Sequence, residues 1–111
     1  MIEITKSNWT EKITENKKLI IADYYALWCG KCRMLMPAIE KLEEKYPECE
    51  FVKVNVEDSS LSFVPADIEL TEVRSLPHIK FIFNNKEMRT LTNGITPNAI
   101  EVAISEIQNL I

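Results

Sequence analysis

The sequence predicts an α/β fold, and three stretches carry that prediction. Residues 19–26 form a nearly continuous apolar run of strand length, residues 32–46 carry apolar side chains at helical spacing, and residues 51–56 alternate as a strand does. A strand, a helix and a strand in this order form a right-handed crossover unit, so we expect the two strands to pair in parallel. Because 111 residues suffice for one hydrophobic core but not for two ordinary ones, we expect one domain over residues 1–111.

The chain opens with short elements and then enters the central strand. Residues 2–4 alternate as a short strand, and the polar residues before Trp9 favour a helix over about residues 9–16. Residues 19–26 lack the polar alternation of a half-exposed strand, so we expect this strand to be covered on both faces. Asp23 is the one acidic residue within it.

The helix predicted over about residues 32–46 is amphipathic, because charged residues fill the face opposite its apolar positions. Pro37 removes one backbone donor and is expected to kink this helix after its first turn, and Pro47 ends it. The apolar positions are Leu35, Met36, Ile39, Leu42 and Tyr46.

A hairpin is predicted in the second half of the chain. We expect a short helix and a loop over residues 57–75, followed by a strand over residues 79–83 whose apolar odd-numbered positions share one face. Residues 84–85 are both Asn and favour a turn, after which residues 87–91 return as the partner strand. Gly94 is expected to close that second strand.

The last predicted element is a helix. Thr96 is suited to cap it, and Pro97 is suited to its first position, where a missing N–H costs nothing. We expect its buried stripe to consist of Ile100, Ala103, Ile104, Ile107 and Ile111.

Composition and charge exclude several functional classes. The hydrophobic and charged fractions, 46% and 27%, are typical of a globular chain in water, and no apolar run has membrane length, so no membrane contact is expected. A net charge of −4 argues against nucleic acid, whose phosphates require clustered Lys and Arg. Residues 1–17 lack the basic head and apolar core of a signal peptide, so we expect a cytoplasmic protein whose partners are other proteins.

Two of the three cysteines, Cys29 and Cys32, follow the apolar strand with two residues between them. In a non-secreted chain this spacing is typical of redox or metal chemistry. If Cys29 lies at the strand end and Cys32 in the first helical turn, the unpaired N–H groups of the helix favour a thiolate at Cys29. That thiolate can attack a disulfide in another protein, and Cys32 can then release the reduced partner. Trp28 would shield one side of the site, and Gly30 would leave room for a substrate backbone.

Asp23 precedes this pair on the buried strand. Burial disfavours the charged form of a carboxyl group, so Asp23 is a candidate to pass a proton to or from Cys32. The alternative is an acid that only hydrogen-bonds in the core.

A structural zinc site is the alternative for the cysteine pair, because C-x-x-C is also a zinc-binding spacing. A second C-x-x-C is missing, so Cys49 and His78 would have to complete the ligand set. Cys49 is expected at the far end of the helix from Cys32, roughly 1.5 Å per residue away, so we expect redox chemistry and no metal. Cys49 itself is expected to be a partly buried thiol, with a regulatory or intermolecular disulfide as the alternative.

The residues around the pair resemble the thioredoxin family. Residues 21–34, IADYYALWCGKCRM, with Pro37 behind them, resemble its active-site region. Residues 53–57, KVNVE, resemble its third strand, residues 74–77, RSLP, resemble its cis-proline loop, and Gly94 matches the glycine of its substrate groove. The resemblance implies a thioredoxin fold, which is a central mixed β-sheet flanked by α-helices.

The resemblance also implies a thiol-disulfide oxidoreductase that reduces protein disulfides without a cofactor. Cys29 would be the nucleophile, Cys32 the resolving thiol, and Asp23 the buried proton carrier with Lys53 as its neighbour. The partners would be disulfide-containing proteins and a thioredoxin reductase or other electron donor, and the protein would act as a monomer in electron transport and cell redox homeostasis. A disulfide isomerase or oxidase role and a non-catalytic thioredoxin-like adaptor are the alternatives.

Substrate would bind beside the cysteines. By the resemblance, Leu76 would pair its backbone with a bound substrate strand, and Pro77 would be cis. The substrate-binding residues would be Trp28, Gly30, Lys31, Leu76, Pro77 and Gly94.

Four departures from the family pattern bear on this site. Lys31 stands where proline is usual, and a looser turn with a cation favours the dithiol, so we predict a more oxidising couple than in proline-bearing thioredoxins. The segment over residues 57–75 is longer than expected and would alter docking of the reductase or substrate. His78 would tune the cysteines. Lys80 on a central strand requires either a poorly covered face or an acidic partner.

Overall fold

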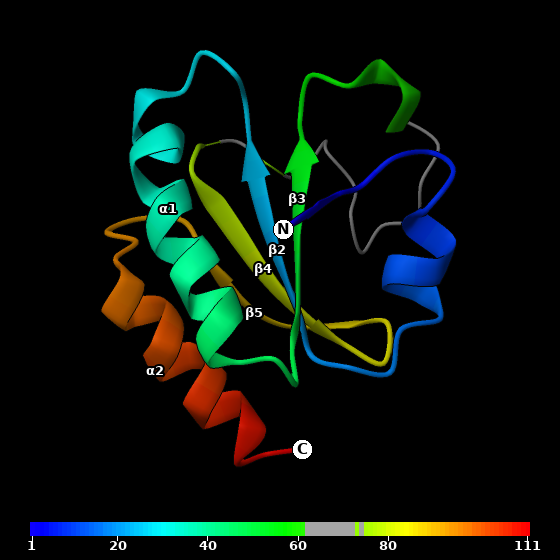
Figure 1. Ribbon diagram of the computed structural model, residues 1–111, viewed down its shortest axis with the longest axis vertical. Helices are drawn as coiled ribbons and strands as arrows, with labels where there is room; N and C mark the ends of the chain where they lie inside the picture. Colours follow the sequence, from blue (N-terminus) through cyan, green and yellow to red (C-terminus); the bar gives the residue numbers. More distant parts are fainter. Residues whose placement is uncertain (62–72, 74) are drawn as a thin grey trace.

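A mixed β-sheet is the framework of the protein in the computed structural model, which describes residues 1–61, 73 and 75–111 (Figure 1). Within this part of the chain the strands lie in the order β1-β3-β2-β4-β5. β3 pairs in parallel with β1 and β2, whereas β4 runs antiparallel to β2 and β5. The predicted parallel pairing across the crossover is therefore confirmed. The strands are β1 (Ile2–Glu3), β2 (Ile20–Tyr25), β3 (Glu50–Asn55), β4 (His78–Phe83) and β5 (Lys86–Leu91).

Helices cover both faces of this sheet. The two long helices, α1 (Gly30–Lys45) and α2 (Pro97–Gln108), lie side by side on one face (Figure 1). The π-helical turn η1 (Thr10–Thr14) lies on the other face, and the 3-10 turn η2 (Ser59–Leu61) contributes Leu61 to the core there. This arrangement is the thioredoxin fold that the sequence predicts.

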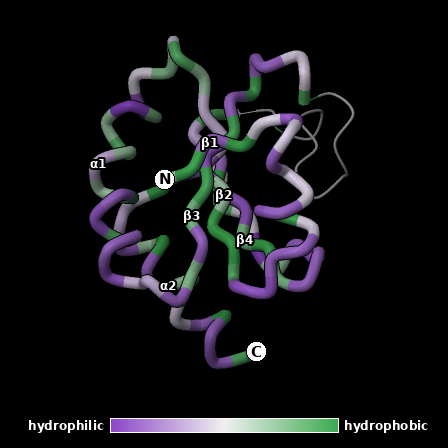
Figure 2. Tube along the Cα trace, turned by 45° about the vertical axis from the view of Figure 1, so that its right-hand side comes forward, coloured by the Kyte–Doolittle hydropathy of each residue, from purple (hydrophilic) through white to green (hydrophobic). Residues whose placement is uncertain are grey.

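The core has one layer on each side of the sheet. β2 is therefore buried along its whole length, as expected for a strand covered on both faces. Alternate residues of β2 enter opposite layers: Ile21 packs with α1 and α2, whereas Ile20 and Tyr24 pack with Ile13 of η1. Hydrophobic stretches accordingly follow the central strands in Figure 2, and hydrophilic residues dominate the outer turns of the helices.

Several predicted boundaries shift in the structure. The first helix is a five-residue π-helical turn rather than a helix over residues 9–16. β5 ends at Leu91, three residues before Gly94, so Gly94 does not close it. Ile111 is 51% exposed and does not belong to the buried stripe, since α2 ends at Gln108. Of the segment predicted as a short helix and a loop, residues 62–72 and 74 lie outside the described part.

Lys80 is nearly fully buried, at 2% exposure, and its amine has an acidic partner. Its Nζ lies 3.5 Å from Oε1 of Glu87 on β5 and 5.4 Å from the centre of the Tyr24 ring. The second of the two sequence alternatives for Lys80 is therefore correct. His78 lies on the same face of β4 and packs edge-on against Tyr24, with ring centres 5.5 Å apart. Its influence on the cysteines stays a prediction.

Candidate active site

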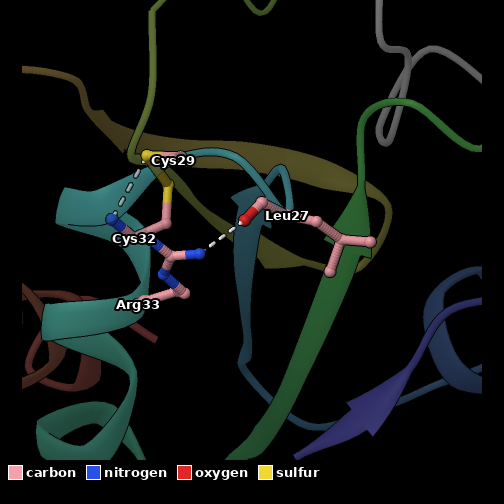
Figure 3. Close-up of a disulfide and its surroundings, with 4 residues drawn as sticks. All are labelled: Leu27, Cys29, Cys32 and Arg33. Carbon is pink, nitrogen blue, oxygen red and sulfur yellow. Dashed lines mark hydrogen bonds between the residues drawn. A yellow bond between two sulfur atoms is a disulfide. The ribbon is translucent and has the colours of Figure 1, made fainter.

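Cys29 and Cys32 lie at the start of α1 and are joined by a disulfide, with Cα atoms 5.3 Å apart. Cys29 is the N-cap residue: its own N–H donates to the Ala26 carbonyl at 3.1 Å, and its sulfur accepts the N–H of Cys32 at 3.2 Å (Figure 3). A thiolate at Cys29 would accept this bond and face the positive end of the helix. The helix begins at Gly30, two residues earlier than predicted, and Cys32 lies in its first turn as expected.

The two sulfurs belong to an otherwise apolar environment. Cys29 and Cys32 are 5% and 1% exposed, and they cluster with Tyr25 and Ala26. Trp28, directly before Cys29, is 67% exposed. Both cysteines are buried, and Cys29 is the slightly more exposed of the two, which suits attack by Cys29 and resolution by Cys32.

Arg33 fixes the loop that carries the first cysteine, a role that the sequence reasoning missed. Its Nη1 donates to the carbonyl of Leu27 at 3.0 Å, so the helix and the loop before it are tied together (Figure 3). The signal was present in the sequence, because Arg33 directly follows the cysteine pair. The bond turns the guanidinium toward Leu27.

Asp23 is buried in the sheet beside this site. It is 1% exposed, and its neighbours across the sheet are Lys53 on β3 and Ile79 on β4. Burial raises the pKa of its carboxyl group to about 7, and the charge of Lys53 opposes that rise. Among the described residues neither carboxylate oxygen has a hydrogen-bond partner, and the role of Asp23 as a proton carrier stays a prediction.

Tyr25 shares a face of β2 with Asp23 and clusters with the cysteines, and the sequence assigned it no role. It lies two positions beyond Asp23 on the same face of β2, roughly 7 Å along the strand, and packs against the disulfide. Its hydroxyl donates to Oε1 of Glu3 at 2.6 Å, and Nζ of Lys53 lies 6.0 Å from its ring centre. Burial, and then the Glu3 carboxylate, raise the pKa of the Tyr25 hydroxyl above its ordinary value of 10.0, so the phenol stays protonated.

A groove of about 560 Å³ lies beside the start of α1. It brings together four of the six residues expected to bind substrate: Lys31, Leu76, Pro77 and Gly94. The Leu76–Pro77 peptide bond is cis, as the resemblance implied. Gly94 has a φ of 59°, a conformation that favours glycine.

Trp28 and Gly30 do not line this groove in the described part of the chain. Gly30 is exposed, and a β-carbon there would meet none of the described atoms within 4 Å, so space for an approaching backbone exists. Met34 does line the groove and is 82% exposed, although the sequence analysis assigned it no binding role.

Cys49 is buried away from the pair, in the layer between the sheet and the two long helices. Burial, with a smaller contribution from Glu48, raises the pKa of its thiol to about 11. Nε2 of Gln108 lies 3.8 Å from its sulfur.

Among residues 1–61, 73 and 75–111, no three or more His, Cys, Asp or Glu side chains gather as a metal would require. In the same part of the chain no helix is long and apolar enough to span a membrane.

A disulfide that caps the helix after a central parallel strand defines a thiol-disulfide oxidoreductase site on a thioredoxin fold. The family model described as Thioredoxin matches residues 1–106, and the chain belongs to the thioredoxin family. Thioredoxin-1 of Saccharomyces cerevisiae is 35% identical over 102 residues, which are 91% of each chain. Thioredoxin-3, mitochondrial, of the same yeast is 35% identical over 108 residues, 94% of this chain and 80% of the relative.

The fold comparison agrees with the sequence comparison. The crystal structure of thioredoxin f2 from Chlamydomonas reinhardtii superposes with a TM-score of 0.80 and covers 97% of this chain and 96% of its own. At 22% identity this likeness concerns the fold alone.

Proposed function

We propose that the protein reduces disulfides in other proteins by cycling between a Cys29–Cys32 dithiol and the disulfide. The observation that carries this proposal is the hydrogen bond from the Cys32 N–H to the Cys29 sulfur at the start of α1. The Cys29 thiolate attacks one sulfur of the target disulfide, forms a mixed disulfide and expels the other target sulfur as a thiolate. Cys32, after losing its proton, attacks the Cys29 sulfur and releases the second target thiol, so two electrons pass to the target.

Asp23 takes the proton that Cys32 must lose. Its pKa of about 7 lets it exchange a proton near neutral pH, and Tyr25, its neighbour on the same face, packs against the disulfide. Asp23→Asn should slow resolution of the mixed disulfide and flatten the dependence of turnover on pH near neutrality. Stopped-flow turnover from pH 6 to 9 tests this, and an Asn variant with the wild-type profile contradicts it.

The target binds along the groove beside α1. The backbone of Leu76, next to the cis Pro77, pairs with the target strand, Gly94 leaves room on the far wall, and Trp28, Gly30 and Lys31 contact the target beside Cys29. The clustering of Lys31, Leu76, Pro77 and Gly94 in one groove supports this assignment.

The protein acts as a monomeric single domain, and a thioredoxin reductase or another electron donor restores its dithiol. In this way it takes part in electron transport and cell redox homeostasis. We place it in the cytoplasm because a reductase needs a compartment that keeps thiols reduced. Sedimentation of the reduced and oxidised protein tests the monomer, and fractionation of the source cells tests the location.

Insulin reduction tests the activity. Catalytic amounts of the protein should accelerate precipitation of insulin by dithiothreitol, Cys29→Ser should abolish the acceleration, and Cys49→Ser should keep it because Cys49 is buried away from the pair. No acceleration by the wild-type protein contradicts the proposal and favours an adaptor. Recovery of scrambled ribonuclease without insulin reduction favours an isomerase.

A further inference from the structure

Among the described residues, one charged side chain lines the groove beside the cysteines. Of its lining side chains in the described part of the chain, Lys31 is the only ionisable one. Lys31 is exposed, and no hydrogen bond or ion pair within that part engages its amine. No described residue of the groove therefore compensates this positive charge, although the whole protein carries a net charge of −4.

The neighbouring walls of the groove are uncharged. Met34, on the same helix as Lys31, presents an 82% exposed apolar side chain, and Leu35 and Ala38 continue the wall along α1. Asn93 and Thr92 on the far side are polar without charge. The other cation near the pair, Arg33, is held against the Leu27 carbonyl (Figure 3). An acidic group in the groove therefore meets one free cation and no carboxylate among these walls.

We propose that this groove selects disulfide-bearing protein segments that are apolar but carry an Asp or Glu beside the reacting cysteine. The amine of Lys31 attracts the carboxylate of this acidic residue. The inference rests on the proposed reductase function and adds the class of substrate. Attraction to Lys31 favours the acidic segment, and repulsion disfavours a basic one, which is how charge at a rim creates specificity. Exposed charge pairs are weak, so the preference is about threefold at low ionic strength and falls with salt.

Paired peptides test this inference. Each of the two peptides carries one intramolecular disulfide. Their sequences differ only in the residue next to the first cysteine, and this residue is Glu in one peptide and Lys in the other. The wild-type protein should reduce the Glu peptide with a kcat/KM about threefold higher at low salt. The ratio between peptides is measured on one enzyme and divided by the ratio of their reduction rates with dithiothreitol alone, so that neither the redox potential of a variant nor the intrinsic reactivity of each peptide disulfide enters it.

Variants locate the preference. Lys31→Gln should bring the ratio near one, Lys31→Glu should reverse it, and 0.5 M NaCl should flatten it. Lys41→Glu makes the same charge change on the exposed side of α1, roughly 15 Å further along the helix, and should keep the preference. If the wild-type protein reduces insulin but reduces both peptides with equal kcat/KM, the inference is wrong. A preference that survives Lys31→Gln also overturns it. If the wild-type protein does not reduce insulin, the reductase function itself is overturned.

Discussion

Asp23 is the residue at which burial changes chemistry most directly. Its carboxyl group has an ordinary pKa of 3.8, and burial raises that pKa to about 7 although Lys53 lies opposite on β3. The desolvation of a carboxylate inside the sheet therefore outweighs attraction to one half-buried amine. The same desolvation that supports the proposed proton transfer by Asp23 also makes its ionised form destabilise the folded protein.

Stability should accordingly fall with pH because of Asp23. The folded state binds the Asp23 proton more tightly than the unfolded state does. The contribution of Asp23 to the free energy of unfolding is therefore greatest below about pH 4, declines up to about pH 7 and stays low above it. Since one pKa unit corresponds to about 1.4 kcal/mol, Asp23→Asn should raise the free energy of unfolding at pH 8 by up to about 4 kcal/mol. Urea unfolding of the oxidised protein from pH 4 to 8 measures this.

Glu40→Gln on the exposed side of α1 is the matched control and should keep the decline. An Asp23→Asn protein that is no more stable than the wild type at pH 8 contradicts the assignment of a buried, costly carboxylate.

Lys31 is also the residue on which the predicted redox potential depends. A cation there would stabilise the Cys29 thiolate, and a lysine would leave the turn looser than proline does, so we expect both effects to favour the dithiol. Lys31→Pro should lower the reduction potential by about 20 mV, the equivalent of about 1 kcal/mol for two electrons. Redox titration against glutathione measures it, and an unchanged or higher potential in the variant refutes this role of Lys31.

The helices position the site, and α1 does so through its buried side. Ile39 is fully buried between α1 and the sheet, whereas Met34 on the same helix is 82% exposed. Ile39→Ala should lower the free energy of unfolding by about 2–5 kcal/mol, because it leaves a cavity. Met34→Ala should change it by less than about 0.5 kcal/mol. Equal losses in guanidinium unfolding contradict this placement of α1.

The cap of α2 is an independent test at the same scale. Oγ1 of Thr96 accepts the N–H of Ala99 at 3.1 Å, which satisfies one of the free donors at the start of the helix. Thr96→Ala should cost about 1 kcal/mol of stability. Ser105→Ala, on the exposed face of the last turn of α2, should cost nothing because alanine favours helix. Thermal unfolding of the two variants compares them, and a harmless Thr96→Ala contradicts the cap.

The elements were predictable because their signals are local. The positive φ angles of Asn84 and Asn85, 52° and 60°, match the hairpin turn that an Asn pair favours. Thr96 and Pro97 mark the start of α2 where the structure has it. The ends were less predictable: the buried stripe of α2 stops before Ile111, since the chain leaves the helix and periodicity no longer applies.

At the scale of the whole molecule, the site depends on contacts that no local pattern contains. The bond between Tyr25 and Glu3 joins two strands separated by β3, and the ion pair of Lys80 with Glu87 depends on the hairpin register. The groove likewise joins the start of α1 to two distant loops, so Met34 could not be placed in it from spacing alone. The cysteine pair was identified because its spacing and its place after the buried strand are readable in the sequence.

The central claim is that Cys29 attacks and Cys32 resolves, and trapping of the mixed disulfide tests it most directly. Cys32→Ser, incubated in reduced form with a disulfide-bearing target protein, lacks the resolving thiol and should accumulate a covalent adduct at Cys29 that dithiothreitol releases. Cys29→Ser and the wild-type protein are the controls and should accumulate none. Peptide mapping by mass spectrometry should place the target on Cys29; no adduct, or an adduct on Cys49, would contradict the account.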